Sequence, residues 1–191
     1  MLRTRPRPPG QPKCADVGDL YRAHAPAVAR WAARLGGPGI DPEDVVHEVF
    51  LVAHRRFSEF RWEAKITTWL FRTTELVVRG HRRKARVYAW LRRQVAADRD
   101  SDQSRDGARP LSPVEELIER QRVRHVYRAL DALGAKYRSL FVLFELEGLS
   151  GDEIAALTGL KVATVWVRLH RARARFVKVV NALAAREEDW P

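Results

Sequence analysis

The 191-residue sequence contains one cysteine, Cys14, which excludes a disulfide framework and a cysteine-based zinc cluster within the chain. Apolar runs are also short, and none approaches the length that a bilayer-spanning helix needs. The first residues place arginines between prolines and lack the apolar core of a signal peptide. We therefore expect a cytoplasmic protein that is not inserted in a membrane.

Recognisable catalytic motifs are missing as well. His47 and Glu48 are not followed by a second histidine at the spacing of a zinc-protease helix, because His54 lies too far along the chain. The glycine patterns of phosphate-binding loops, dinucleotide-binding turns and nucleophile elbows do not occur. The sequence therefore predicts no catalytic residue, no metal site and no cofactor, and we do not expect an enzyme.

Basic residues outnumber acidic ones, with 35 lysines and arginines against 24 aspartates and glutamates, and the net charge is +11. This balance favours a polyanionic partner, nucleic acid first and an anionic membrane surface second. Hydrophobic residues make up 46% of the chain, which is enough for two small cores. The alternation typical of strands is not seen, so the pattern predicts an all-α protein.

Composition and periodicity divide the chain into four segments. Prolines and basic residues predict a disordered basic arm over residues 1–15. Helical periodicity predicts one small domain over residues 16–95 and a second over residues 112–182. Between them, residues 96–111 are rich in aspartate, serine, arginine and glycine, which is typical of a flexible, solvated linker.

The first domain should contain three helices. Asp16 can cap the first, in which Pro26 can cause a kink or an early break. Asp41 and Pro42 begin the second, and the third begins at Thr67. The expected buried side of the third helix comprises Trp69, Thr73, Leu76, Val77 and Gly80.

The rest of the third helix is strongly basic, and no acidic residue occurs between Glu75 and Asp98. Such a run can bind phosphates without choosing sequence, and a nearby aromatic side chain can stack on an unpaired base. Trp62, in the loop before this helix, is the candidate for stacking, although it can equally belong to the core.

A helix-turn-helix is predicted near the end of the second domain. Residues 150–153 read SGDE, a capping box that begins a short helix, and Gly159 can supply the left-handed exit. A second helix follows from about Val162, with an outward face that DNA could contact. The apolar stripe of this second helix comprises Val165, Leu169, Ala172 and Phe176.

These residues also carry a family resemblance. Residues 149–155 (LSGDEIA) and 164–173 (TVWVRLHRAR) closely resemble the C-terminal DNA-binding domain of extracytoplasmic-function (ECF) sigma factors of bacterial RNA polymerase. Residues 41–50 (DPEDVVHEVF) look like the segment by which such factors bind the polymerase clamp. Residues 57–86 resemble the part that recognises and opens the −10 promoter element, although Leu76 stands where the family commonly has asparagine.

The resemblance implies a dissociable subunit that binds core RNA polymerase and promoter DNA and directs transcription initiation, with an anti-sigma factor as a further partner. Together with the helical pattern, it predicts three sets of contacts. The polymerase contacts are Asp44, His47, Glu48 and Leu51. The −10 DNA contacts are Trp62, Lys65, Arg72, Arg79, Arg82, Arg83, Lys84 and Arg86. The −35 DNA contacts are Lys161, Ala163, Thr164, Trp166, Val167, Arg168, His170, Arg171 and Arg175.

Two alternatives remain open at this point. A free-standing helix-turn-helix regulator would use the first domain for dimerisation or sensing, and the acidic start of the second helix argues against it. Within the recognition helix, Val167 and Trp166 can both face DNA and contact thymine methyl groups. If Trp166 instead packs against the preceding helix, Val167 alone is free to do so.

Overall fold

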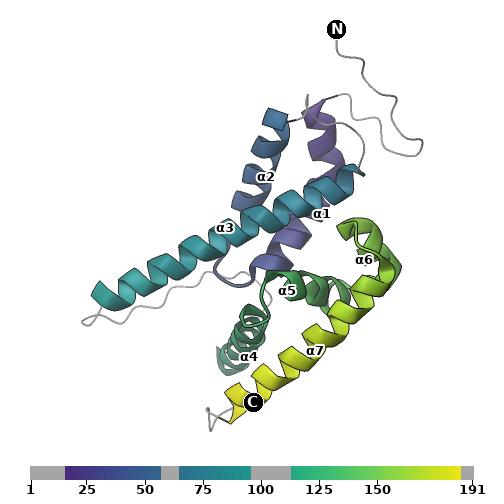
Figure 1. Cartoon of the computed structure of the whole chain (residues 1–191). Helices are drawn as coiled ribbons and strands as arrows, with labels where there is room; N and C mark the ends of the chain where they lie inside the picture. Colours follow the sequence, from purple (N-terminus) through teal and green to yellow (C-terminus); the bar gives the residue numbers. More distant parts are fainter. Residues whose placement is uncertain (1–15, 57–64, 96–112, 186–191) are drawn as a thin grey trace.

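The computed structural model describes residues 16–56, 65–95 and 113–185, and over these residues it is helical throughout (Figure 1). The predicted all-α class is therefore confirmed. The predicted arm, the predicted linker and the loop that carries Trp62 lie outside the described residues, apart from Lys65. The elements are α1 Val17–Gly36, α2 Pro42–Arg56, α3 Ile66–Val95, α4 Pro113–Asp131, α5 Ala135–Phe141, the π-helical turn η2 Val142–Leu146, α6 Gly151–Thr158 and α7 Val162–Ala184.

Local signals place the first two helices where the sequence predicts them. The Asp16 carboxylate accepts a hydrogen bond from the Asp19 amide at 2.8 Å, which satisfies a free donor at the start of α1. The Asp41 carboxylate does the same for the Glu43 amide at 2.8 Å. Pro26 does not interrupt α1, which continues to Gly36.

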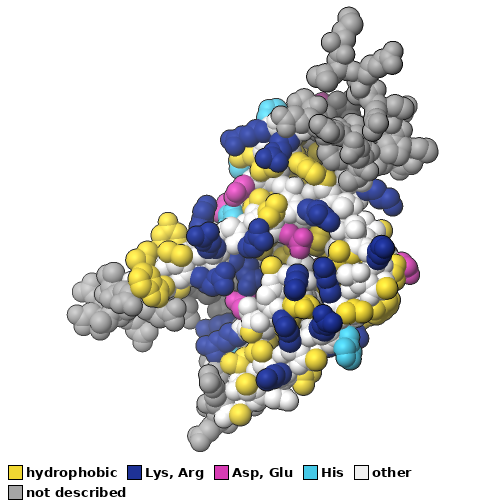
Figure 2. All heavy atoms as spheres, viewed as in Figure 1, with side chains coloured by type: hydrophobic (Ala, Val, Ile, Leu, Met, Phe, Trp, Pro, Cys, Tyr) yellow, Lys and Arg dark blue, Asp and Glu magenta, His cyan; other side chains and the backbone are white. Residues whose placement is uncertain are grey.

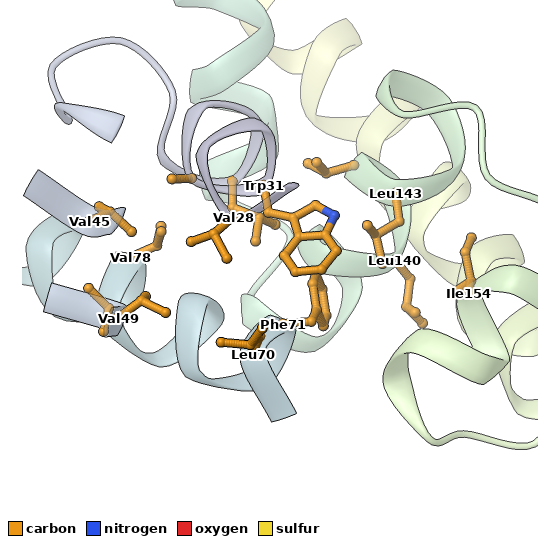
Figure 3. Close-up of a cluster of buried hydrophobic side chains, with 14 of the residues drawn as sticks. Val28, Trp31, Val45, Val49, Leu70, Phe71, Val78, Leu140, Leu143 and Ile154 are labelled. Atoms are coloured by element: carbon orange, nitrogen blue, oxygen red, sulfur yellow. The ribbon is translucent and has the colours of Figure 1, made fainter. Parts of the chain in front are cut away.

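Helices α1, α2 and α3 form the N-terminal half and pack around a shared core. Val28 and Trp31 of α1, Val49 of α2, and Leu70 and Phe71 of α3 are buried in it (Figure 3). Complete burial of an aliphatic or aromatic side chain stabilises a fold by about 1.5–3 kcal/mol. Contacts of this kind therefore hold three helices whose outer faces are polar.

The predicted buried side of α3 is wrong in part. Thr73 and Val77 are buried, but Leu76 is 57% exposed and Gly80 is exposed, while Leu70 and Phe71 are fully buried. Residues 69–71 (WLF) and 76–78 (LVV) are each three consecutive apolar residues. Periodicity alone therefore cannot choose which residue of each run faces the core. Packing against α1 on one side and α6 on the other decides the outcome.

The C-terminal half, α4 to α7, has its own apolar centre. Leu140, Leu143, Ile154 and Leu169 are almost completely buried. The predicted stripe of α7 is confirmed, because Val165, Leu169 and Ala172 are fully buried and the Phe176 ring stacks on Phe141 with centroids 4.6 Å apart. This stripe fixes which face of α7 points away from the protein.

The two halves share one continuous core. Figure 3 shows Trp31 and Phe71 between the valines of the N-terminal half and Leu140, Leu143 and Ile154 of the C-terminal half. The two rings meet edge to face, with centroids 5.3 Å apart. No helix in the described part of the chain is long and apolar enough to cross a membrane.

Candidate nucleic-acid interface

The helix-turn-helix is built by the capping box that the sequence predicts. The Ser150 hydroxyl accepts a hydrogen bond from the Glu153 amide at 3.2 Å, and the Ser150 amide donates to the Glu153 carboxylate at 2.8 Å. The Ser150 hydroxyl also donates to the Glu153 carboxylate at 2.8 Å, and the hydrogen bonds from the Ser150 amide and hydroxyl lower the pKa of Glu153. At the other end of α6, Gly159 adopts a φ of 68°, the left-handed conformation that a side chain would disfavour.

The outward face of α7 carries most of the residues predicted to contact the −35 element. Val167 is 51% exposed and Trp166 is 46% exposed, whereas Thr164 is half-buried. The remaining exposed members are Lys161, Ala163, His170, Arg171 and Arg175. Apolar and basic side chains therefore stand together on one accessible helix face, as a major-groove contact requires.

Trp166 is held at the edge of this face. Its ring meets Phe144 edge to face, with centroids 5.6 Å apart. The indole also lies against Gly151, where an added Cβ would come within 2.7 Å of Trp166 Cζ2. Trp166 thus packs against the start of α6 and remains half exposed, while Val167 is free. The sequence predicts that a helix begins at Gly151 but not that Trp166 packs there, although a glycine at the first position of a capped helix is a usable signal.

Arg168 lies apart from the other predicted −35 contacts. It is half-buried and lines a cavity between α3 and the C-terminal half, on a different side of α7 from Val167. Its predicted contact with the −35 element therefore has no support from its position. Arg175 stays on the outside, where its guanidinium lies 4.5 Å from the centre of the Tyr137 ring.

The predicted −10 contacts on α3 fall into two groups. Lys65, Arg79, Arg83, Lys84 and Arg86 are exposed. Arg72 and Arg82 are instead engaged with the C-terminal half: Arg72 donates to the Thr158 carbonyl at 2.8 Å, and Arg82 pairs with Asp131. Thr68 adds a hydrogen bond to the Ala156 carbonyl at 3.0 Å. The contact between the halves therefore uses two arginines that the sequence predicts to contact DNA.

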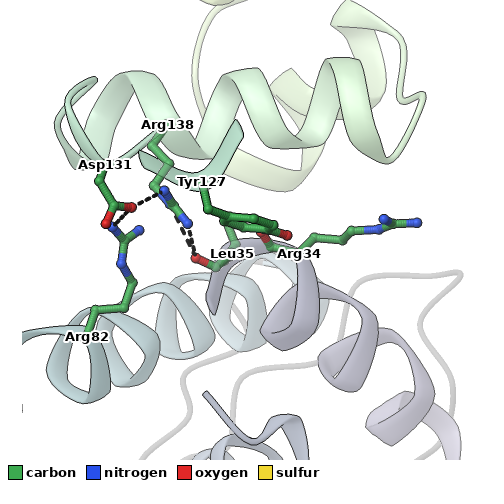
Figure 4. Close-up of polar contacts among 6 residues, drawn as sticks. All are labelled: Arg34, Leu35, Arg82, Tyr127, Asp131 and Arg138. Carbon is green, nitrogen blue, oxygen red and sulfur yellow. Dashed lines mark hydrogen bonds and ion pairs between the residues drawn. The ribbon is translucent and has the colours of Figure 1, made fainter. Parts of the chain in front are cut away.

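A buried arginine stands at the centre of this contact (Figure 4). Arg138, with only 6% of its side chain exposed, donates from Nη1 to Asp131 at 2.7 Å and from Nη2 to the Leu35 carbonyl at 2.9 Å. Burial, followed by repulsion from Arg82, lowers the pKa of Arg138 to about 10. The guanidinium thereby supplies a hydrogen-bond donor to a carbonyl at the C-terminal end of α1. A cation is favourable there because the helix end carries a partial negative charge.

Tyr127 and Glu147 extend the contact along α1. The Tyr127 hydroxyl donates to the Arg34 carbonyl at 3.3 Å, and its ring lies so close to Gly37 that an added Cβ there would be 2.3 Å from Tyr127 Cδ1. Gly37 has a φ of 78°, so its conformation also favours glycine. Glu147 forms an ion pair with Arg34 at 3.4 Å.

A cavity of about 640 Å³ opens where α3 faces α5, α6 and α7. Glu75 and Asp131 are its acidic residues. Its basic residues are Arg72, Arg79, Arg82, Arg86, Lys136, Arg138 and Arg168. Figure 2 shows the concentration of lysine and arginine side chains over this part of the surface. The positive charge predicted for α3 is therefore joined by charge from α5 and α7.

The predicted polymerase contacts lie on one side of α2. Asp44, His47, Glu48 and Leu51 are all exposed, and Leu51 is 42% exposed although it is apolar. Glu48 also pairs with His81 of α3, with Nε2 and Oε2 2.8 Å apart. Within the described residues, no three potential metal ligands come together.

Comparison with known proteins identifies the two halves. Residues 20–96 match the family described as Sigma-70 region 2, and residues 124–176 match the family described as Sigma-70, region 4. The chain is 33% identical over 155 residues to the ECF RNA polymerase sigma-E factor of Escherichia coli, which covers 78% of each protein. The chain therefore belongs to the ECF sigma factors of RNA polymerase.

A second relative agrees with this assignment, and one solved structure has a similar fold. The ECF RNA polymerase sigma factor SigE of Mycolicibacterium smegmatis is 35% identical over 156 residues, which is 81% of this chain and 58% of that longer protein. The solved structure of CnrH in complex with the cytosolic domain of CnrY is 26% identical, with a TM-score of 0.54 over 87% of this chain and 88% of that one.

Proposed function

We propose that this protein binds core RNA polymerase through α2 and promoter DNA through α3 and α7, and so directs transcription initiation in the cytoplasm. The polymerase supplies the chemistry, and the sigma factor is not itself an enzyme. The observation that carries the proposal is the presence of two separate surfaces in one chain, an exposed acidic and apolar side of α2 and an exposed recognition face on α7. A free-standing helix-turn-helix regulator needs only the recognition face on α7.

Each half then has a distinct task. The exposed arginines of α3 hold the phosphates of the −10 region, which adds affinity without sequence preference. The α7 face reads the −35 element, with Val167 placed for a thymine methyl group and Arg171 for phosphate or a guanine edge. An anti-sigma factor is a third proposed partner, and the related CnrH was solved with a protein partner of its own.

Charge reversal on α2 tests the proposal. Asp44→Lys combined with Glu48→Lys should abolish co-purification with core RNA polymerase, because the contact surface changes sign while the apolar core is untouched. Circular dichroism should show unchanged helicity. Since Glu48 pairs with His81, the matched control is His81→Gln, which removes that pair and leaves the α2 surface intact. Undiminished co-purification of the double variant would count against the proposal.

A further inference from the structure

The cavity between the two halves holds more positive charge than its acidic residues can balance. Asp131 already accepts from both Arg82 and Arg138. Glu75 is half-buried; burial, the largest effect, raises its pKa, while Ser139 of α5 and the nearby charges of Arg72 and Arg79 lower it. Two acidic residues therefore face seven basic ones on the cavity wall and cannot balance their charge.

Three arginines on the cavity wall form no direct ion pair in the described part of the chain, and the nearby charge of Glu75 is shared between one of them, Arg79, and Arg72. Arg79 and Arg86 come from α3, one helix turn on either side of Arg82, and Arg168 comes from α7 on the other wall. Placing like charges around a partly enclosed space is unfavourable unless an anion enters it. Arginine is also the side chain best suited to phosphate, because its planar fork can donate two parallel hydrogen bonds.

The size of the cavity limits the ligand. About 640 Å³ lies within the range of roughly 300–1,000 Å³ that small-molecule sites occupy. A single phosphate ion could reach the cations of one wall, whereas a chain of two or three phosphates can reach arginines on both α3 and α7. We propose that this cavity binds a compact oligophosphate, either inorganic or as the phosphate chain of a nucleotide.

Occupation of the cavity has a consequence for the whole molecule. An anion held by Arg79 of α3 and Arg168 of α7 links the two halves and stabilises their packed arrangement. Arg72 and Arg82, which line the same cavity, then stay engaged with Thr158 and Asp131. The ligand and promoter phosphates therefore compete for α3, but binding itself is measured without DNA and does not depend on the proposed function.

Isothermal titration calorimetry of the full chain with sodium tripolyphosphate, without magnesium and at constant ionic strength, tests the proposal. We expect saturable binding of one ion per chain and no comparable binding of monophosphate. Arg79→Gln combined with Arg168→Gln should weaken binding by about tenfold or more, since each removes a charge-assisted contact. The matched control, Arg55→Gln with Arg56→Gln, removes the same charge from exposed residues on α2 and should leave affinity within about twofold.

A variant that is expected to bind more tightly provides a test that misfolding cannot mimic, because misfolding would only weaken binding. Glu75→Gln removes a negative charge from the cavity wall and should tighten tripolyphosphate binding by about threefold. Titration with ATP distinguishes an inorganic oligophosphate from a nucleotide. An affinity equal to that of tripolyphosphate indicates that the phosphate chain alone is recognised, and tighter binding of ATP indicates a nucleotide. Equal weakening by both arginine pairs, or no saturable binding, would overturn the proposal.

Discussion

The two surfaces assigned to DNA are in different states in this structure. The outward face of α7 is open, with Val167 and Trp166 about half exposed. On α3, by contrast, Arg72 and Arg82 are already bonded to the C-terminal half. A guanidinium that donates to a protein carbonyl or carboxylate cannot make the same bonds to a phosphate. Contact between promoter DNA and Arg72 or Arg82 would therefore require these bonds to break, whereas Arg79, Arg83, Lys84 and Arg86 are already exposed.

The largest expected effect comes from breaking the contact between the halves. Asp131→Asn leaves Arg82 and the buried Arg138 facing each other without their carboxylate. We expect the packed arrangement to lose about 2–3 kcal/mol, because an unpaired buried charge is costly. Small-angle X-ray scattering should show a larger radius of gyration. Glu145→Gln, which breaks an exposed pair with Arg173 inside the C-terminal half, is the control and should not expand the molecule.

A second change should disturb α7 without touching α3. Gly151→Val places a branched side chain where the Trp166 indole lies, so the indole must move. We expect a loss of about 1–3 kcal/mol in thermal stability from overpacking, with weaker binding to −35 duplexes. Gly80→Ala on α3 is the control, because nothing lies within 4 Å of an added Cβ there. Its stability should stay the same or rise slightly. Normal −35 binding by Gly151→Val would show that the Trp166 position is unimportant.

A smaller effect distinguishes recognition of thymine methyl groups by apolar side chains of α7 from nonspecific attraction between its basic residues and DNA phosphates. Replacing thymine by uracil removes only the methyl group, so binding should weaken by about 1 kcal/mol at one or two −35 positions. Val167→Ser should make binding indifferent to that replacement. A fluorescence anisotropy scan across the element measures both. If no position responds, the exposed valine does not read thymine, although the helix-turn-helix assignment is unaffected.

The smallest effect concerns Glu75, at the boundary of the two regions. Burial raises its pKa in the folded protein, so the stability that it contributes is fully present below the unfolded value and is lost as the pH rises through the folded value. Glu75→Gln should therefore match the wild type near pH 4 and be the more stable protein at about pH 7, as thermal unfolding at each pH would show. A constant difference between the two proteins would contradict this.

Local features of this fold could be predicted from the sequence. Asp16 and the SGDE box at residues 150–153 cap helices through bonds to residues at most three positions away. The α7 stripe was predictable because one helical period accounts for it. Exposure of the four α2 residues follows in the same way, once the apolar stripe of that helix is assigned to the core.

The contact between the halves could not be predicted in this way. From the sequence, Arg138 cannot be distinguished from a surface arginine. Its side chain is nevertheless only 6% exposed and donates a hydrogen bond to the Leu35 carbonyl, 103 positions earlier in the chain. Nothing near Leu35 or Arg138 in the sequence indicates the other. The same limit explains why Arg82 was assigned to DNA alone, and why the buried side of α3 was only partly predicted.

The separation of Leu35 and Arg138 along the chain also affects the order in which contacts form during folding. During synthesis, the end of α1 and all of α3 leave the ribosome while the arginine that will cover the Leu35 carbonyl has yet to be made. Contacts between residues this far apart in the chain are slow to form, since a long loop must close first. Each newly made molecule therefore begins with the α3 arginines uncovered, and it can form the interface between its halves only after the C-terminal half has been made.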